Sequence, residues 1–276
     1  MVNPAVNTPH ENIQVFDLEA RARCRQRAAP DFENYSFLQT WAQDQLSERL
    51  QDIKRTFQST HELTPCDFSG KLEALGFTDE SLELITSNLN LHAINDLPGV
   101  LLQIRKALQA DGLFIGALFG GETLYELRES LMQAEIELKG GVSPRVFPFA
   151  DKQQIGGLLQ RAGFALPVVD SEIITVTYDN MFKLMHDLRG MGESNVIAAR
   201  SRTNPGKAFF MNAAQRYLEN HAEKDGRIKA SFEIIFLLGW APHDSQQKPL
   251  KPGSAQSRLA DALNTDEIKT GEKPAP

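Results

Sequence analysis

The feature that most constrains this chain is a strand–helix–strand spacing between residues 82 and 119. Residues 82–87 and 113–119 are apolar runs of strand length, and a helix pattern between them begins at Asp96 and extends to Leu108. Two strands joined by a crossover helix lie parallel in one sheet, and the connection is right-handed. The spacing therefore predicts an open α/β sheet, which binds its ligands at the carboxyl ends of the strands.

The elements that follow this unit extend the same architecture. The sequence pattern predicts helices over 123–139, 151–162, 180–188 and 206–222, and residues 110–112 are expected to form a turn before the second strand. Residues 167–178 and 228–240 are rich in β-branched and aromatic residues, which favours strands. We expect these last two strands to form an antiparallel pair at the end of the sheet.

The region before residue 82 is less regular. A helix capped by Asp31 is predicted, with apolar positions every three or four residues from Leu38 to Phe57. Residues 58–80 are interrupted by a proline and two glycines, and only a short piece over 71–75 is expected to be structured. The predicted organisation is a disordered tail over 1–13, N-terminal helices over 14–57, an α/β domain over 58–245 and a loosely ordered tail over 246–276.

The composition excludes several classes of protein. A net charge of −7 and a pI near 5.5 argue against nucleic-acid binding, which needs a basic surface. The two cysteines, Cys24 and Cys66, form no metal-ligand motif and indicate a reducing compartment. No apolar run is long enough to span a membrane, and residues 1–14 lack the pattern of a signal or transit peptide. We expect a bacterial cytoplasmic setting, with the mitochondrial matrix as the alternative.

Polar side chains follow the strand at 82–87. Asn88, Asn90 and His92 alternate along an extended segment and would project to one side, where amide and imidazole groups can orient a ligand. We assign these three residues as candidate cofactor-binding groups. The alternative is that they cap the following helix and satisfy the backbone of the loop.

Two further segments are candidates for a substrate site or lid. The first follows the strand at 113–119, and the second is the polar, glycine-containing stretch 187–195. Their candidate residues are Gly120, Gly121, Glu122, Tyr125, Arg128, Asp187, Arg189, Glu193 and Asn195. For the first segment, the alternative is a tight turn before a helix with an acidic first turn. For the second, it is a helix end followed by a turn.

A basic cluster near the N-terminus has two interpretations. Arginines occupy positions 21, 23, 25 and 27, and they are either the solvated face of a terminal helix or a surface for an anionic partner or membrane. No serine, cysteine or histidine arrangement typical of a nucleophilic enzyme is present, so no catalytic residue is assigned.

Several motifs in the same order resemble one known family. They are residues 16–17 with the arginine cluster and 27–29, then 87–99, 110–128, 187–195 and 239–250. Together they resemble the methyltransferase-fold proteins related to mitochondrial complex I assembly factor 5, neighbours of the malonyl carrier methyltransferases. The resemblance runs from about Val15 to Arg258. It implies a Rossmann-like class I methyltransferase fold with an S-adenosylmethionine site, and a protein substrate or assembly partner such as a complex I subunit.

The chain departs from this family in one region. Family members carry an acidic Gly-rich turn and a second acidic strand end, which hold the cofactor's methionine portion and ribose. Here only 24 residues separate Phe57 from Leu82, and they contain no such turn. We therefore expect a fold that is incomplete in its N-terminal half, with cofactor affinity that is absent or on the order of 10³-fold weaker than in the relatives.

Two functional classes follow from the resemblance. The first is an enzyme acting on a protein side chain, by methyl transfer or by arginine hydroxylation. The second is an assembly or scaffold protein of methyltransferase fold that has lost cofactor binding. The missing strands would leave the strand at 82–87 as an unpaired edge. We therefore expect the Leu38–Phe57 helix or a second copy to cover it, and expect an isolated chain to self-associate. Peripheral membrane contact is left open.

Overall fold

The computed structural model describes residues 14–68, 73–247, 254 and 259–266. It divides into two compact units, Met1–Pro242 and His243–Pro276. The helices of the first unit are α1 (Leu18–Ala28), η1 (Ala29–Tyr35, a 3-10 helix), α2 (Phe37–Gln51), α3 (Leu97–Ala107), α4 (Tyr125–Lys139), α5 (Lys152–Arg161), α6 (Met181–Gly190) and α7 (Lys207–His221). Its strands are β1 (Thr60–Leu63), β2 (Leu82–Asn88), β3 (Leu108–Phe119), β4 (Ala165–Tyr178) and β5 (Ile228–Trp240). The second unit holds α8 (Leu259–Leu263).

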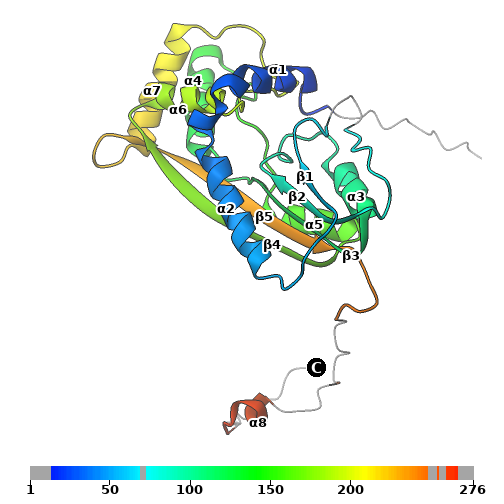
Figure 1. The fold of residues 1–276 in the computed structure, drawn as a ribbon. Coiled ribbons are helices and arrows are strands. Elements are labelled where there is room, and N and C mark those ends of the chain that lie inside the picture. Colours follow the sequence, from blue (N-terminus) through cyan, green and yellow to red (C-terminus); the bar gives the residue numbers. More distant parts are fainter. Residues whose placement is uncertain (1–13, 69–72, 248–253, 255–258, 267–276) are drawn as a thin grey trace, which may run out of the picture. The chain divides into compact units, whose positions relative to one another are not determined.

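The described residues form one mixed five-stranded sheet in the order β1-β2-β3-β5-β4. β1, β2 and β3 are parallel, and Ile85 lies opposite Phe114. β5 is antiparallel to both β3 and β4, with Ile115 opposite Leu238. The predicted parallel unit and the predicted antiparallel pair are both confirmed, and they share one sheet (Figure 1).

Alternating side chains of the central strands bury two separate cores. Leu113 and Ile115 pack with residues of α2, α4, α6 and α7 on one face of the sheet. Phe114 and Leu118 point to the other face and pack with α3 and α5. This is the layered packing expected when strands are apolar on both faces. A third, smaller cluster that includes Phe16 and Phe147 lies beneath α1.

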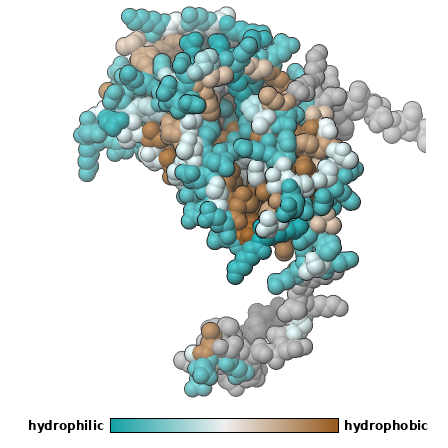
Figure 2. Space-filling model, in the orientation of Figure 1, coloured by the Kyte–Doolittle hydropathy of each residue, from teal (hydrophilic) through white to brown (hydrophobic). Residues whose placement is uncertain are grey.

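Helix α1, η1 and the ends of α4, α6 and α7 gather at one end of the sheet, while α2 runs across the strands (Figure 1). The predicted helix stripe is confirmed in part, because Leu38, Ala42 and Leu46 are buried in the core. Figure 2 shows that hydrophilic side chains cover most of the visible face, with apolar ones grouped near α7 and again low in the centre of the view, beside α2. None of the described helices is long and apolar enough to cross a membrane.

Residues 60–63 correct the expectation that 58–80 contains almost no regular structure. They form β1, which pairs with β2 from Leu84 to Ser87 and buries Leu63 completely. The expected unpaired edge at 82–87 is therefore wrong, because β1 covers it. The strand is only four residues long, and its stability comes from backbone pairing with β2 that no local sequence pattern reports.

Two boundaries also differ from the sequence expectations. Asp31 lies inside η1, and α2 begins after Ser36 and ends at Gln51, although Phe57 still packs against the same core. The turn expected at residues 110–112 does not precede the strand. β3 already begins at Leu108, so these residues lie within it. Asp111 takes a left-handed φ of 62°, and hydrogen bonds between Ala241 and residues 111–112 carry the pairing through this irregular point.

The expected tail over 1–13 and part of the piece 71–75 lie outside the described residues. In the second unit, His243 Nδ1 is 2.7 Å from Ser245 Oγ.

Candidate functional site

The residues at the end of β2 join three elements. Leu89 takes a left-handed φ of 51°, which turns the chain away from the strand. Asn88 Nδ2 donates to Gln39 O of α2 at 2.9 Å, and Asn90 Nδ2 donates to Leu63 O of β1 at 3.0 Å. Asn88 Oδ1 is buried and has no hydrogen-bond partner among the described residues. The two amides therefore hold the strand end in place, while one acceptor stays available.

His92 and Glu193 form a buried pair at the same edge. His92 Nε2 lies 3.1 Å from Glu193 Oε2, and the side chains are 0% and 11% exposed. The imidazole packs against Phe119, with ring centroids 4.8 Å apart, and against Phe149 at 6.0 Å. Because a carboxylate only accepts hydrogen bonds, we place the hydrogen on Nε2. His92 Nδ1 then has no partner within the described part of the chain.

Two arginines of α1 surround this pair. Arg21 is buried and donates to Asn90 O at 3.0 Å and to Ala93 O, while Arg25 is half-buried. Burial, together with the neighbouring Arg25, lowers the pKa of Arg21 to about 9. The expectation that the whole arginine cluster is a solvated helix face is therefore wrong for these two residues, because every second arginine faces inward toward Glu193.

The electrostatics of the pair favour a charged carboxylate. Burial raises the pKa of Glu193, but His92, Arg25 and Arg21 outweigh it and bring the pKa to about 2. Burial lowers the pKa of His92, with Glu193 acting in the opposite direction. The low pKa of Glu193, which His92 helps to lower, favours a charged imidazole beside it, whereas the burial of His92 favours a neutral imidazole. We assign an ionised Glu193, because Arg21 and Arg25 supply positive charge whichever state His92 takes.

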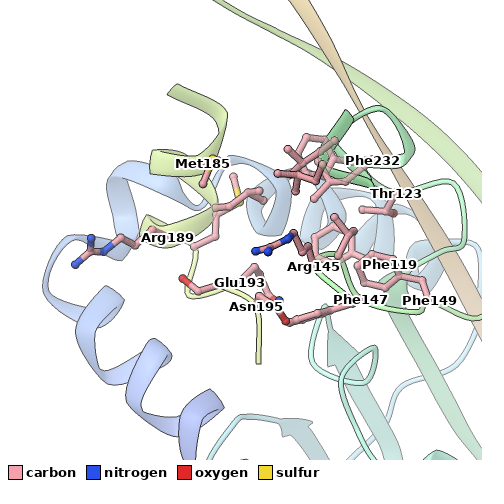
Figure 3. A pocket seen from close by; sticks show the side chains of 17 residues that line it. Phe119, Thr123, Arg145, Phe147, Phe149, Met185, Arg189, Glu193, Asn195 and Phe232 are labelled. Atoms are coloured by element: carbon pink, nitrogen blue, oxygen red, sulfur yellow. The ribbon is translucent and has the colours of Figure 1, made fainter. Parts of the chain in front are cut away.

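A cavity of about 180 Å³ opens beside Glu193 (Figure 3). We call it the phenyl cavity, because Phe119, Phe147, Phe149 and Phe232 form one side of it. Figure 3 shows the Arg145 guanidinium pointing into it, whereas Arg189 points away. Arg145 is bound to the buried Glu135, with Nη2 at 2.7 Å from Oε1. Its charge is therefore balanced within the wall.

A larger cavity of about 560 Å³ lies at the carboxyl ends of β1 and β2. We call it the strand-end cavity; its lining includes Arg25, Gln39, Glu62, Asn88, Asn90, Met191 and Glu193. Met191 and Glu193 line both cavities. The two spaces therefore adjoin each other on either side of the loop that carries Glu193.

The candidate residues after β3 do not line either cavity. Gly120 N donates to Glu233 O at 2.9 Å, and Glu122 N donates to the Glu233 carboxylate at 3.0 Å. Arg128 donates to Gly121 O and to Thr123 O. Tyr125 lies against His221, with ring centroids 5.9 Å apart. These contacts agree with the alternative reading, a tight turn before α4.

The stretch 187–195 combines both readings proposed for it. Met191 N bonds Asp187 O, Glu193 N bonds Leu188 O, and Gly192 has a φ of +80°, which is a glycine-dependent helix end. Arg189 in the last turn of α6 lines the phenyl cavity, as do Glu193 and Asn195 beyond the helix end, whereas Asp187 does not. Asn195 Nδ2 bonds Pro144 O at 3.0 Å and so fixes the loop against the segment that carries Arg145.

The sequence reasoning missed several lining residues. Arg145, Phe147 and Phe149 lie in a proline-containing loop, and Gln39 and Glu62 lie on elements that precede β2. Two phenylalanines in a loop were a usable signal, because loops seldom carry large apolar side chains without burying them. Among the described residues, no group of three or more His, Cys, Asp or Glu side chains could hold a metal ion.

Comparison with known proteins gives consistent matches. A model of the methyltransferase domain family matches residues 22–116. The arginine-hydroxylase NDUFAF5, mitochondrial, of Danio rerio is 34% identical over 95% of this chain and 94% of the relative. The protein of that name from Dictyostelium discoideum is 48% identical, but the match covers 69% of this chain and 44% of the relative. The malonyl-[acyl-carrier protein] O-methyltransferase of Xylella fastidiosa is 35% identical over 74% of this chain and 66% of the relative.

Among solved structures, the Burkholderia thailandensis 1,6-didemethyltoxoflavin-N1-methyltransferase matches with a TM-score of 0.42 and 12% identity. That match covers 88% of this chain and 94% of the other.

Proposed function

The chain belongs to the family of the NDUFAF5 arginine hydroxylases, and we propose that it acts on an arginine side chain of a protein partner during complex I assembly. Its domain is a class I S-adenosylmethionine methyltransferase domain. The observation that carries the proposal is the pair of adjoining cavities at the ligand edge of the sheet, with Glu193 in the wall of both.

The phenyl cavity suits one side chain better than a free small molecule. Its volume of about 180 Å³ is below the roughly 300–1,000 Å³ of ordinary ligand pockets. Aromatic faces bind the flat guanidinium group of arginine, and a carboxylate pairs with it. Phe119, Phe149 and Glu193 provide this combination. The resident Arg145 is neutralised by Glu135 and does not compete for Glu193.

The strand-end cavity fits S-adenosylmethionine by its size and by its acceptors. Gln39 Oε1 and Asn88 Oδ1 are buried there without partners among the described residues, and the Glu62 carboxylate stands at the end of β1. These oxygens suit the ribose hydroxyls and the ammonium group of the cofactor. When bound, S-adenosylmethionine supplies an electrophilic methyl group attached to a sulfonium.

The chain's own residues prepare the reacting side chain. Glu193 is charged and would orient the guanidinium at the boundary between the two cavities. His92 holds one of its oxygens at 3.1 Å, so the carboxylate keeps a fixed direction. The phenylalanine rings exclude water, which strengthens the charge interaction inside the cavity.

A second candidate function is assembly without catalysis. The sequence between β1 and β2 lacks a Gly-rich turn, and Asp67 instead closes a local turn by accepting from Thr64 N at 2.6 Å. A fold shortened in this half would bind the cofactor weakly, and the protein would then serve as a scaffold for its partner.

The proposed function is tested by co-expressing the chain with the complex I subunits of its host. Tandem mass spectrometry then maps arginines that gain one methyl group or one oxygen atom. We expect a modified arginine with the wild type, a loss of roughly tenfold or more with Glu193→Gln, and no change with the exposed control Glu219→Gln. Circular dichroism confirms that each variant is folded.

The alternatives give different results. If complex I assembles only when the chain is present but no arginine is modified, the scaffold function is supported instead. If assembly and modification are the same without the chain, both functions are overturned.

A further inference from the structure

The outward-facing arginines of α1 lie beside a second group of arginines from another segment. Arg23 and Arg27 are exposed on one side of α1, while Arg200 and Arg202 follow the short segment that ends at Ile197. We propose that this arginine cleft, lined by Arg23, Arg27 and Arg200, binds an acidic segment of the protein partner. The inference deepens the proposed function, because it assigns a docking element beside the target arginine.

The charged side chains that line the cleft are all positive, although Asp17 and Glu19, which do not line it, pair with Arg200 and Arg23. The cleft has a volume of about 550 Å³ and is lined by the three arginines together with Gln26, Ser194 and Asn195, and by no carboxylate. The chain as a whole has a net charge of −7, so a positive cavity is contrary to its average. Guanidinium groups with neighbouring amide and hydroxyl donors are the usual receptors for carboxylates.

The guanidinium groups of Arg23 and Arg27 are only lightly occupied by the protein itself, whereas Arg200 is paired with Asp17 at 2.9 Å. Arg23 has an exposed partner, Glu19, at 3.6 Å, and such surface pairs contribute little. Arg27 is turned back along its helix, with Nε on Arg23 O at 3.3 Å and Nη2 on Cys24 Sγ at 3.1 Å. Neither arginine is paired with a buried carboxylate, so both can donate hydrogen bonds to a carboxylate of a bound partner.

The two walls of the cleft are fixed to each other. Asp17 caps α1 by accepting from Ala20 N, and its other oxygen binds Arg200 at 2.9 Å. Backbone bonds from Asp17 N to Val196 O and from Ala198 N to Val15 O, both 2.8 Å, join the segments. The two segments that carry the arginines are therefore held in position before any partner binds, which reduces the entropy lost on binding.

The position of the cleft relative to the phenyl cavity gives it a role. Ser194 and Asn195 line both spaces, so the cleft opens beside the cavity that would hold the target arginine. An acidic residue a few positions from that arginine in an extended peptide could reach the cleft while the arginine enters the cavity. The cleft would then select which arginine is presented.

A protein segment is favoured over a membrane surface. Membrane-surface helices combine basic residues with exposed large apolar side chains. Within the described residues, none of the large hydrophobic side chains that are exposed lies on α1 or between residues 194 and 202. The cleft therefore offers charge without an apolar anchor.

The test measures binding directly, without activity. A fluorescein-labelled peptide with one arginine followed by four glutamates is titrated with the full chain by fluorescence anisotropy, and the same peptide with glutamines serves as the neutral probe. We expect the double variant Arg23→Gln with Arg27→Gln to weaken binding of the acidic peptide roughly tenfold or more. Arg161→Gln, an exposed arginine on α5, is the matched control and should bind as the wild type does. Raising the salt concentration should weaken binding of the acidic peptide only.

Equal affinity for the acidic and neutral peptides, or equal loss in the control variant, would overturn the inference. Capture of phosphatidylglycerol vesicles that depends on Arg23 and Arg27, with no binding of the acidic peptide, would also overturn it in favour of a membrane surface. Failure of the proposed function gives a different pattern, in which the acidic peptide binds through the cleft but no arginine is ever modified.

Discussion

Glu135 links the wall of the phenyl cavity to the pH response of the fold. It is 4% exposed and binds Arg145 and the backbone and hydroxyl of Ser143. Burial raises its pKa, but Arg145 and Ser143 outweigh burial and lower the pKa from the ordinary 4.5 to about 2. The ionised carboxylate therefore stabilises the folded state and fixes the side chain of Arg145.

We predict that Glu135→Gln removes part of the acid sensitivity of the protein. A carboxyl with a lowered folded pKa contributes stability above its unfolded pKa and loses it as the pH falls toward the folded value. The window is therefore from about pH 5 down to about pH 2, and the contribution is at most about 3 kcal/mol. Urea unfolding at several pH values should show a shallower loss of unfolding free energy in the variant than in the wild type. An identical slope would contradict this role of Glu135.

The site could be predicted from sequence only where residues lie next to a strand end or helix end. His92 and Glu193 were both recognised, but as members of two separate segments, because residues 101 positions apart are paired only by the fold. Arg21 is a residue for which the sequence pattern predicts exposure and the fold buries the side chain. Its alternation with Arg23 looks like a charged surface, and only the approach of the loop carrying Ala93 makes it a buried donor.

At the scale of elements, α2 fastens the N-terminal region to the sheet. Leu46 is 1% exposed and belongs to the core cluster, and Trp41 packs on Phe236 of β5 with ring centroids 5.9 Å apart. Arg49 lies over the same ring at 3.8 Å and pairs with Asp170 on β4. The helix therefore contacts the strands through apolar and charged groups together.

We predict that Leu46→Ala lowers the free energy of unfolding by about 2–5 kcal/mol, because it leaves a cavity under α2. Glu48→Ala, two positions away on the exposed side, should change it by less than about 0.5 kcal/mol. Chemical denaturation of both variants gives the comparison. If the two losses are equal, α2 does not pack against the sheet as described.

The elements that sequence reasoning recognised are those with long apolar runs, namely β2, β3, β4 and β5 and the helices between them. β1 was missed because four residues, of which one is fully buried, carry no periodic signal. The helix start was placed too early, at Asp31, since a 3-10 turn and an α-helix start share the same capping residues.

At the scale of the whole molecule, the pairing of β1 with β2 removes the premise of the expected self-association. β1 pairs with β2 over residues 84–87, and Leu38, Ala42 and Leu46 of the α2 stripe are buried in the core. β1 brings Glu62 to the strand-end cavity, but the Gly-rich turn that the family resemblance led us to expect after this strand has no counterpart in the sequence.

The measurement that tests this account most directly is a ligand-observed NMR titration of the full chain with S-adenosylmethionine. The account predicts saturable binding with a dissociation constant on the order of 1 mM, because the acceptors of the strand-end cavity remain and the Gly-rich turn does not. Glu62→Gln should weaken this binding further, and Glu48→Gln should leave it unchanged. No binding at several times that concentration, or equal binding by the wild type and Glu62→Gln, would contradict the assignment of the cavity to the cofactor.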